Sequence, residues 1–339
     1  MQSANPSQKW RFYPHGDFGE VDIADLKTTL NTLGKKREPF LFVIDFSLKD
    51  FYLSPLSKVD KDIEYSLATP RTHTYHDKQI PYNYKPISKV RYTKAFEAIQ
   101  EEIKKGNTYL INLTFPSKFI INYSLKEIYD YTDAKFKLRF KDKFVCFSPE
   151  RFIKINNNTI YTHPMKGTID ATIQNAKEKI LANEKEMAEH TMVVDLLRND
   201  LSMVASKVRV EKFRYVESIK AGKRELLQVS SKIKGDLEED WQARIGDILT
   251  TLLPAGSITG TPKKITTDII QNIEGYERGF YSGVFGVFDG ENLDSAVMIR
   301  YIEKKGDALY YKSGGGITID SDLDAEYDEM CEKIYVPFL

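Results

Sequence analysis

A lysine stands directly before a glycine and two residues after a proline in the stretch T-H-P-M-K-G-T, residues 162–168. Lysine supplies a positive charge on a flexible stem and, once its proton is removed, a nitrogen nucleophile. Lys166 could therefore be a surface lysine at a strand end, a clamp for a phosphate or carboxylate, or a nucleophile. The other candidate groups of the chain decide between these three.

A carboxyl group comes shortly before this lysine, in the S-P-E stretch that ends at Glu150. If strands 151–155 and 159–163 form a hairpin around N-N-N, partner numbers sum to about 314, and Glu150 opposes Pro164. Lys166 is then a diagonal neighbour of Glu150 on the same face. The spacing thus predicts a carboxyl and an amine in one place, and it leaves open an ordinary surface ion pair.

Two pairs of glutamates recur at helical spacing further along the chain. Glu186 and Glu189 are at i and i+3, as are Glu326 and Glu329, with Lys333 one turn further on. Residues at this spacing line one face of a helix. Converging carboxylates suit a hard cation such as Mg²⁺, which takes one or two carboxylates plus water and ligand oxygens. The charge pattern alone leaves open a solvated helix face.

Glycine-rich backbone forms a third candidate feature, in P-A-G-S-I-T-G-T-P-K (254–263) and S-G-G-G-I (313–317). Glycines allow backbone N–H groups to approach an anion closely. Neither stretch matches the phosphate-binding pattern G-x-x-x-x-G-K-[ST], and no G-x-G-x-x-G follows an expected strand. Glycines of ordinary tight turns are the alternative.

Hydrophobic periodicity and turn residues indicate which elements position these groups. Residues 71–88 are expected to form a loop. The run S-A-V-M-I-R-Y-I is expected to be one strand of a three-stranded antiparallel set. Strands in runs with helices in blocks favour an α+β fold with mostly antiparallel sheets. Strands are expected at 40–46, 108–115, 143–148, 151–155, 159–163, 208–217, 225–234, 281–288, 295–302 and 308–313, and helices near 94–106, 183–201, 239–253, 262–274 and 323–334.

Details of two helices follow from side-chain type. In the helix that carries Glu189, we expect Met187, Val194 and Leu197 to share one side. In the helix after the 254–263 stretch, Thr261 is a natural N-cap and Pro262 a natural first residue.

Composition excludes several classes of protein. The 339 residues include 49 basic and 49 acidic residues, so no global field favours nucleic acid or an anionic membrane. Cys146 and Cys331 lie far apart, which argues against a disulfide scaffold and a zinc site. The N-terminus lacks an apolar signal core, and no stretch approaches 18 apolar residues. These features predict a cytoplasmic protein without nucleic-acid or membrane partners.

The order of the motifs is more specific than any one of them. S-P-E, P-M-K-G-T, E-x-x-E-H-x-M-V-V-D-L-L-R-N-D-L, P-A-G-S-I-T-G-T-P-K, Y-S-G-V-F-G, A-V-M-I-R, G-G-G-I and E-Y-D-E-M-C-E-K occur in series. From about residue 90 to 339 the chain resembles the chorismate-utilising enzymes. The resemblance implies two mostly antiparallel β-sheets packed as a sandwich with helices outside. Residues 86–339 would form the chorismate-binding catalytic domain, and residues 1–85 a reduced N-terminal part of the same sandwich.

The resemblance also implies an activity. Aminodeoxychorismate synthases of this family carry lysine at the position of Lys166, whereas anthranilate synthases have alanine. That lysine is held to attack ring carbon 2 of chorismate as the 4-hydroxyl leaves, after which ammonia adds at carbon 4. The attack needs a neutral amine, so the pKa of Lys166 must be lowered or its proton removed locally. Glu150 corresponds to the general acid that protonates the leaving hydroxyl.

The remaining family positions imply a pocket for substrate and Mg²⁺. Glu189 and Glu329 are expected to be direct magnesium ligands, and Arg300 with the glycine amides to hold the enolpyruvyl carboxylate. The magnesium-site glutamates are Glu186, Glu189, Glu326 and Glu329, and the substrate-binding positions are Gly167, Thr168, Ser257, Gly260, Tyr281, Arg300, Gly314, Gly315, Gly316 and Lys333.

Three departures refine the expected branch. Leu110 stands where isochorismate and salicylate synthases place a lysine base, which disfavours that branch. The N-P-S-P-Y segment of tryptophan-regulated relatives is not found between 114 and 147. Gln228 stands where many relatives have histidine, and an amide can donate and accept hydrogen bonds but cannot carry charge.

No glutaminase is visible in the sequence, so a separate glutamine amidotransferase subunit is expected to supply ammonia. A lyase segment is likewise not visible, so release of 4-aminobenzoate would need another enzyme. Anthranilate synthase component I, or another chorismate enzyme of the same fold, is the first alternative. A non-catalytic subunit that uses the fold as a binding surface is the second.

Overall fold

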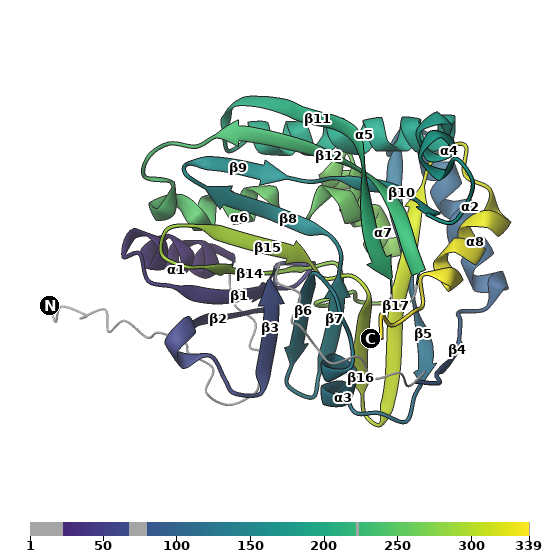
Figure 1. The fold of residues 1–339 in the computed structure, drawn as a ribbon, viewed down its shortest axis with the longest axis horizontal. Helices are drawn as coiled ribbons and strands as arrows, with labels where there is room; N and C mark the ends of the chain where they lie inside the picture. Colours follow the sequence, from purple (N-terminus) through teal and green to yellow (C-terminus); the bar gives the residue numbers. More distant parts are fainter. Residues whose placement is uncertain (1–22, 68–79, 222–223, 339) are drawn as a thin grey trace, which may run out of the picture.

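The computed structural model describes residues 23–67, 80–221 and 224–338 (Figure 1). In these residues the chain forms two β-sheets, and every pairing between named strands is antiparallel. The predicted α+β sandwich of two mostly antiparallel sheets is confirmed.

The first sheet runs in the order β10-β12-β9-β8-β15-β14-β1-β2, and β11 pairs with β12. Its strands lie across the upper part of Figure 1. Their bounds are β1 (Phe40–Ile44), β2 (Phe51–Pro55), β8 (Arg151–Asn156), β9 (Thr159–Thr162), β10 (Met165–Asp170), β11 (Ser206–Ala221), β12 (Arg224–Asp236), β14 (Val284–Phe288) and β15 (Leu293–Val297).

The second sheet runs in the order β13-β5-β17-β16-β7-β6-β3, and β4 pairs with β5. Its strands stand roughly upright, with alternating directions, in the lower and right part of Figure 1. Their bounds are β3 (Ile63–Leu67), β4 (Asn83–Lys85), β5 (Leu110–Ile120), β6 (Phe136–Phe140), β7 (Phe144–Ser148), β13 (Gly260–Thr261), β16 (Tyr301–Lys305) and β17 (Ala308–Ile317).

Eight α-helices and three short 3₁₀ turns complete the described part of the chain. They are α1 (Ile23–Lys35), α2 (Lys89–Lys104), α3 (Leu125–Asp130), α4 (Ala176–Ala182), α5 (Glu184–Ser202), α6 (Ile245–Leu252), α7 (Lys263–Glu274), α8 (Leu323–Glu332), η1 (Leu56–Lys58), η2 (Trp241–Arg244) and η3 (Gly256–Ile258).

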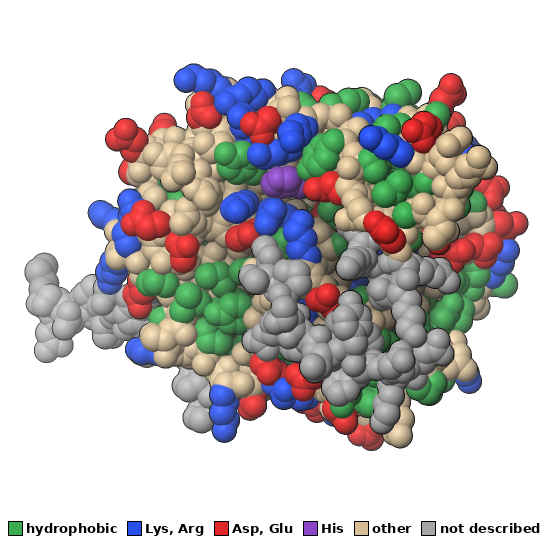
Figure 2. Space-filling view, in the orientation of Figure 1, with side chains coloured by type: hydrophobic (Ala, Val, Ile, Leu, Met, Phe, Trp, Pro, Cys, Tyr) green, Lys and Arg blue, Asp and Glu red, His purple; other side chains and the backbone are tan. Residues whose placement is uncertain are grey.

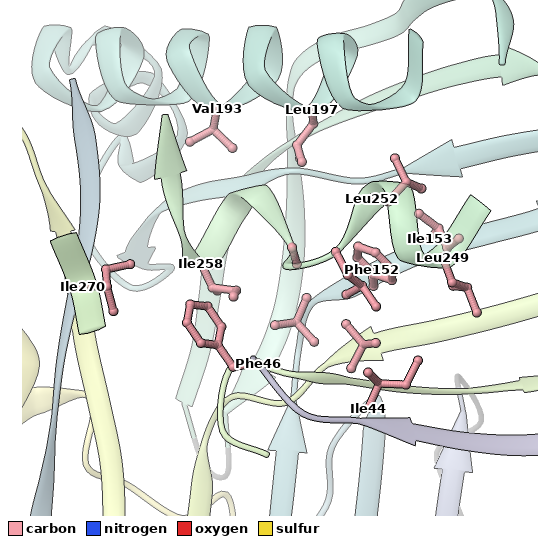
Figure 3. Packing of buried hydrophobic residues seen from close by; sticks show 14 of the residues in the cluster. Ile44, Phe46, Phe152, Ile153, Val193, Leu197, Leu249, Leu252, Ile258 and Ile270 are labelled. Carbon is pink, nitrogen blue, oxygen red and sulfur yellow. The ribbon is translucent and has the colours of Figure 1, made fainter. Parts of the chain in front are cut away.

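Strand β1 shows why the sheets form layers. Phe40, Phe42 and Ile44 belong to the largest core cluster, which also contains residues of α1, α2, α5, α6 and α7. Leu41 and Val43 point the other way, into a second cluster between the two sheets. Successive side chains of a strand face opposite sides, so a strand between two layers is apolar throughout. Figure 3 shows Val193 and Leu197 of α5 pointing from their helix toward this strand layer.

Two of the places where the chain crosses from one sheet to the other lie side by side. One crossing joins β7 to β8 at Glu150, and the other joins β15 to β16 at Arg300. They are tied together, because Val297 N–H donates to the Glu150 carbonyl at 3.2 Å and Phe147 N–H donates to the Arg300 carbonyl at 3.1 Å. The prediction of one strand over S-A-V-M-I-R-Y-I was wrong. The chain turns at Arg300, whose φ of 54° is incompatible with a strand.

The 151–162 hairpin forms, but its register differs from the predicted one. Lys154 pairs with Tyr161, so partner numbers sum to 315. The two-residue turn at Asn157 and Asn158 has positive φ at both positions, as type I′ hairpins require. Strand β10 then leaves the hairpin and pairs with β12. The prediction that Lys166 is a diagonal neighbour of Glu150 across this hairpin was therefore wrong.

Three local predictions also need correction. Met187 is 44% exposed, because the buried face of α5 is formed by Glu189, Val193 and their i+3/i+4 neighbours. Pro262, not Thr261, is the N-cap of α7, since Thr261 is used in strand β13 opposite Leu110. Within the expected loop 71–88, residues 83–85 form β4; residues 71–79 lie outside the described ones.

Two observations concern the prediction that the protein has neither nucleic-acid nor membrane partners. Lys and Arg side chains gather on the upper part of the face in Figure 2, and acidic side chains lie among them. Among the described residues, no helix is both long and apolar enough to cross a membrane.

Candidate active site

The predicted site residues converge where β10, β17, η3, the two sheet crossings and the helices α5 and α8 meet. The glycines of the site report this most directly. A Cβ atom at Gly316 would lie 3.6 Å from Lys166 Nζ, and one at Gly167 would lie 3.1 Å from Glu186 Oε2. A Cβ atom at Gly315 would lie 3.3 Å from Glu326 Oε2. The glycines of β17 thus place only backbone atoms against the charged groups.

Lys166 is paired with Glu189. Its Nζ lies 2.6 Å from Glu189 Oε2, and the side chains are 23% and 6% exposed. Burial would lower the pKa of Lys166, but the Glu189 carboxylate, helped by Glu329 and Glu186, raises it above the usual value. The amine is therefore cationic here. Of the two expected routes to a neutral amine, a lowered pKa is not what this arrangement gives, and local proton removal remains.

The four glutamates differ in what they contact. Glu329 Oε1 lies 2.6 Å from Lys333 Nζ, and its side chain is 46% exposed. Glu326 accepts from Ser321 Oγ at 2.8 Å and lies 3.4 Å from Lys185 Nζ. Within the described residues, Glu186 Oε2 and Glu326 Oε2 are buried without a hydrogen-bond partner. Such oxygens cost free energy unless something pairs with them.

Electrostatics indicates what would pair with these oxygens. Burial raises the pKa of Glu186 and of Glu326, and repulsion from Glu189 and Glu329 adds to it. Among the described residues, no three His, Cys, Asp or Glu side chains stand as a ready-made metal site. Lys166 and Lys333 pair closely with Glu189 and Glu329, and Lys185 pairs more loosely with Glu326. A cation that needs only one or two carboxylates fits the orphaned oxygens, so the residues are compatible with Mg²⁺.

Glu150 occupies the other side of the site, at the first sheet crossing. Its Oε1 accepts a hydrogen bond from Ser257 Oγ of η3. Burial raises the pKa of Glu150, while Ser257, Arg300 and Lys166 act in the opposite direction. The charge of Lys166 therefore acts on the pKa of Glu150, although the two residues are not neighbours in the hairpin. A carboxyl with a raised pKa can hold a proton for donation.

Arg300 and Lys333 supply cationic groups near the glycine strand. The Arg300 guanidinium lies over the Tyr335 ring at 5.0 Å, and its Nε is buried without a partner in the described residues. Lys333 Nζ also donates to the Gly314 carbonyl at 3.0 Å. Tyr281 is buried, and burial raises its pKa to about 12, so its hydroxyl stays protonated near neutral pH.

The remaining predicted positions frame this arrangement. Thr168 is exposed and opposite Gln228 in the sheet, which places the amide that replaces the usual histidine beside β10. A Cβ atom at Gly316 would lie 3.2 Å from Leu110 Cδ1, so Leu110 lines the site as an apolar group. Gly260 has a φ of 133° and packs on the Leu110 carbonyl, where a Cβ atom would lie 1.9 Å away.

Two nearby groups were missed by the sequence analysis. His190 follows Glu189, is fully buried and contacts Ser231 Oγ through Nε2 at 2.6 Å. Lys263 Nζ donates to Asp200 Oδ2 at 2.8 Å and to the Leu252 carbonyl at 2.9 Å, beside the Ser257 turn. Both lie in quoted motifs, E-H and P-K, so motif membership was a usable signal for them.

Comparisons with known proteins agree with this geometry. The family model described as chorismate binding enzyme matches residues 45–338. An uncharacterized PabA-like protein of Haemophilus influenzae is 49% identical over 310 residues, which are 91% of this chain and 94% of the relative.

Two relatives with described activities match less closely. Aminodeoxychorismate synthase component 1 of Bacillus subtilis is 31% identical over 265 residues, 74% of this chain and 55% of the relative. Anthranilate synthase component 1 of Archaeoglobus fulgidus is 30% identical over 309 residues, 86% of this chain and 72% of the relative. The chain thus spans only about half the length of the former.

A solved structure shows the same fold. The menaquinone-specific isochorismate synthase of Escherichia coli superposes with a TM-score of 0.69 at 15% identity, covering 94% of this chain and 82% of that one. The extent of the family match and the identity to the relatives lead to one conclusion: the chain belongs to the chorismate binding enzyme family.

Proposed function

We propose that this chain catalyses the amination of chorismate at ring carbon 4, giving 4-amino-4-deoxychorismate, with ammonia from a separate glutamine amidotransferase. The observation that carries this proposal is the position of Lys166. Its amine lies within the site, 2.6 Å from Glu189 Oε2 and beside Gly316, and it is partly accessible. By the family resemblance, a lysine here belongs to the amination branch.

In the proposed first step Lys166 is the nucleophile. Its nitrogen forms a bond to ring carbon 2, the ring double bond shifts, and the carbon 4–oxygen bond breaks. The ammonium group must first lose a proton, and Glu189 Oε2 is within hydrogen-bond distance to receive it. Covalent catalysis of this kind replaces one difficult substitution by two easier ones.

Glu150 is the proposed general acid of that step. A hydroxyl is a poor leaving group unless it is protonated, and the raised pKa of Glu150 favours a carboxyl that carries the needed proton. Ser257 holds this carboxyl in place. The proton goes to the departing oxygen, which leaves as water.

The second step reverses the first at another carbon. Ammonia forms a bond to carbon 4, the double bond shifts back, and the carbon 2–nitrogen bond breaks, which frees Lys166. The proton lost by the new amino group restores Glu150, and Glu189 returns its proton to Lys166. The sum of the two steps is chorismate plus ammonia giving the aminated product plus water.

Chorismate carries two carboxylates, and the site offers cationic and backbone groups for both. Arg300 and the amides of Gly314, Gly315 and Gly316 suit the enolpyruvyl carboxylate, because a guanidinium and N–H groups bind a planar anion. Gly167, Thr168, Ser257, Gly260, Tyr281 and Lys333 would complete the pocket.

Glu186, Glu189, Glu326 and Glu329 would hold Mg²⁺, which would supply positive charge for the ring carboxylate of the substrate. We expect Glu189→Ala to weaken Mg²⁺ binding at least about tenfold in isothermal titration calorimetry, because it removes a buried ligand. Ser321→Ala, which removes a hydroxyl contact of Glu326, is the milder matched variant. Unchanged Mg²⁺ affinity in Glu189→Ala would contradict the metal assignment.

Intact-protein mass spectrometry tests the amination proposal. Wild type and Lys166→Ala are incubated with chorismate and Mg²⁺, with and without ammonium, and products are identified. We expect a chorismate-derived adduct on the wild type alone, replaced by 4-amino-4-deoxychorismate when ammonium is present. The same product from Lys166→Ala at a similar rate would mean that ammonia attacks directly.

Anthranilate synthesis is the second candidate, since an anthranilate synthase component matches over 86% of this chain. Product identity separates the two, because anthranilate formation releases pyruvate and amination retains the enolpyruvyl ether. Failure to turn over chorismate with ammonium and Mg²⁺ would instead favour a non-catalytic binding subunit.

A further inference from the structure

Behind the site, Arg278 and Glu274 form an ion pair that solvent barely reaches. Arg278 Nη2 lies 2.6 Å from Glu274 Oε1, and the side chains are 2% and 1% exposed. Arg278 Nε donates to Glu274 Oε2 at 2.9 Å. A buried pair costs desolvation and is weak evidence for stability by itself. What the guanidinium holds beyond its partner is therefore the informative part.

Two Arg278 donors reach backbone carbonyls of two different elements. Nη1 donates to the Ile258 carbonyl at 3.0 Å, and Nη2 donates to the Asn112 carbonyl at 2.6 Å. Ile258 directly follows Ser257 in η3. Asn112 lies in β5, opposite Gly316 of the glycine strand. One planar group thus joins the Ser257 turn to the strand that backs the site.

Glu274 extends the same connection. Its Oε1 accepts from the Thr114 backbone N–H at 2.8 Å and from Thr114 Oγ1 at 2.9 Å. Thr114 also lies in β5, opposite Gly314. The Asn112 N–H donates in addition to the Thr259 carbonyl at 2.9 Å. Helix α7, the 256–258 turn and β5 are therefore held together at one buried point.

We propose that Arg278 is a positioning residue: through the Ile258 carbonyl it fixes the 256–258 turn so that Ser257 stays hydrogen-bonded to Glu150. The inference rests on the proposed function only for the role of Glu150 as acid. A guanidinium has five donors in a rigid fork and can serve Glu274 and two carbonyls at once, which an ammonium cannot do in the same geometry.

The groups that face Glu150 determine what should change. Ser257, Arg300 and Lys166 each favour its carboxylate form, against the effect of burial. If the turn is released, the Ser257 hydroxyl no longer donates to that carboxylate. Glu150 should then release its proton at a higher pH than in the wild type.

The test follows the Glu150 carboxyl by ¹³C NMR in protein labelled at glutamate, with Glu150→Gln used to assign the signal. Arg278→Lys is compared with Ser257→Ala and with the control Arg139→Lys, which alters a remote Arg–Glu pair of 2.6 Å between β6 and β3. We expect the Glu150 titration to move to higher pH in Arg278→Lys and Ser257→Ala and to stay unchanged in Arg139→Lys. We also expect kcat of Arg278→Lys to fall about 10- to 100-fold with a smaller change in KM, as for misplacement of a reacting group.

A folded Arg278→Lys whose Glu150 titrates as in the wild type, while Ser257→Ala moves it, overturns the proposal. If Arg278→Lys does not fold, Glu274→Gln replaces it. The amide keeps one acceptor oxygen but cannot accept both hydrogen bonds that Arg278 donates to the Glu274 carboxylate. The titration does not depend on which product is formed. A moved titration without amination would therefore refute the proposed function and leave the positioning role standing.

Discussion

Two lysines of this chain, the partly exposed Lys166 and the buried Lys312, each pair with a glutamate, but their surroundings differ. Lys312 lies in β17 and is 1% exposed. Its Nζ lies 3.0 Å from Glu303 Oε2 and donates to the Arg278 carbonyl at 2.8 Å. The rings of Tyr276 and Tyr301 lie 5.6 and 5.5 Å from it.

The pKa values of the two lysines run against their accessibility. Burial lowers the pKa of Lys312 to about 8, whereas the carboxylates around Lys166 raise its pKa. By proton release alone, Lys312 would be the better nucleophile. However, a substrate cannot reach it, while Lys166 is 23% exposed beside side-chain-free backbone. Lys166 is therefore the candidate nucleophile because it is accessible and because its partner Glu189 can accept its proton.

The largest expected effect is on Lys166. We expect Lys166→Ala to lower kcat by at least about 10³-fold, because the proposed covalent route needs this amine. Steady-state product formation from chorismate and ammonium measures it. Lys312→Met is the comparison variant and should lower kcat far less, because Lys312 is not a proposed reacting group and is connected to the site through the Arg278 carbonyl. Equal losses in both variants would break the distinction between the two lysines.

The next effect concerns the acid that works with Lys166. We expect Glu150→Gln to lower kcat by about 10²- to 10⁴-fold, the usual contribution of a general acid. Because only the protonated carboxyl donates, wild-type kcat should fall as pH rises through the Glu150 pKa, which burial has raised. That alkaline decrease should be absent in Glu150→Gln. A pH–rate profile with the same limb in both proteins would remove Glu150 from the acid role.

The smallest effect should appear in stability, at Lys312. The folded-state pKa is about 8 and the unfolded value about 10.5, so between them the unfolded chain binds more protons. Wild-type stability should therefore gain, by at most a few kcal/mol, as pH rises through this window, relative to Lys312→Met. Urea unfolding of both proteins at about pH 7.5 and 9.5 measures the difference. Glu303 keeps Lys305 at 3.1 Å in the variant, so its charge is not left alone.

An equal change with pH in wild type and Lys312→Met would show that Lys312 is not the group responsible. It would also make the contrast with Lys166 one of access alone.

The sequence was a good guide where one residue type has one dominant use. The helices expected near 94–106 and 262–274 end at Lys104 and Glu274, and Gly106 and Gly275 follow them with φ of 76° and 65°, which glycine adopts readily. The order of motifs placed Lys166, Glu189 and Glu326 in one site before any contact was known. Resemblance carried that result, since charge spacing alone left a solvated helix face open.

Two of the predictions that failed did so for different physical reasons. A single strand over 295–302 was predicted because most of its residues are apolar or aromatic, and pattern alone does not mark a change of sheet. The left-handed φ of Arg300 that makes the crossing is rare for arginine. In the hairpin, the turn contains two residues, Asn157 and Asn158, and not three asparagines as expected. The register is therefore shifted by one residue. Long-range contacts decide where the chain changes sheet, whereas the turn type sets the register of the hairpin.

The adjacent sheet crossings at Glu150 and Arg300 have one more consequence. At each of these two residues the backbone passes from one sheet to the other. A ligand that contacts both side chains acts as a non-covalent cross-link across this seam and resists sliding of one sheet over the other. We therefore expect hydrogen exchange in strands β7, β8, β15 and β16 to slow when the proposed site is filled.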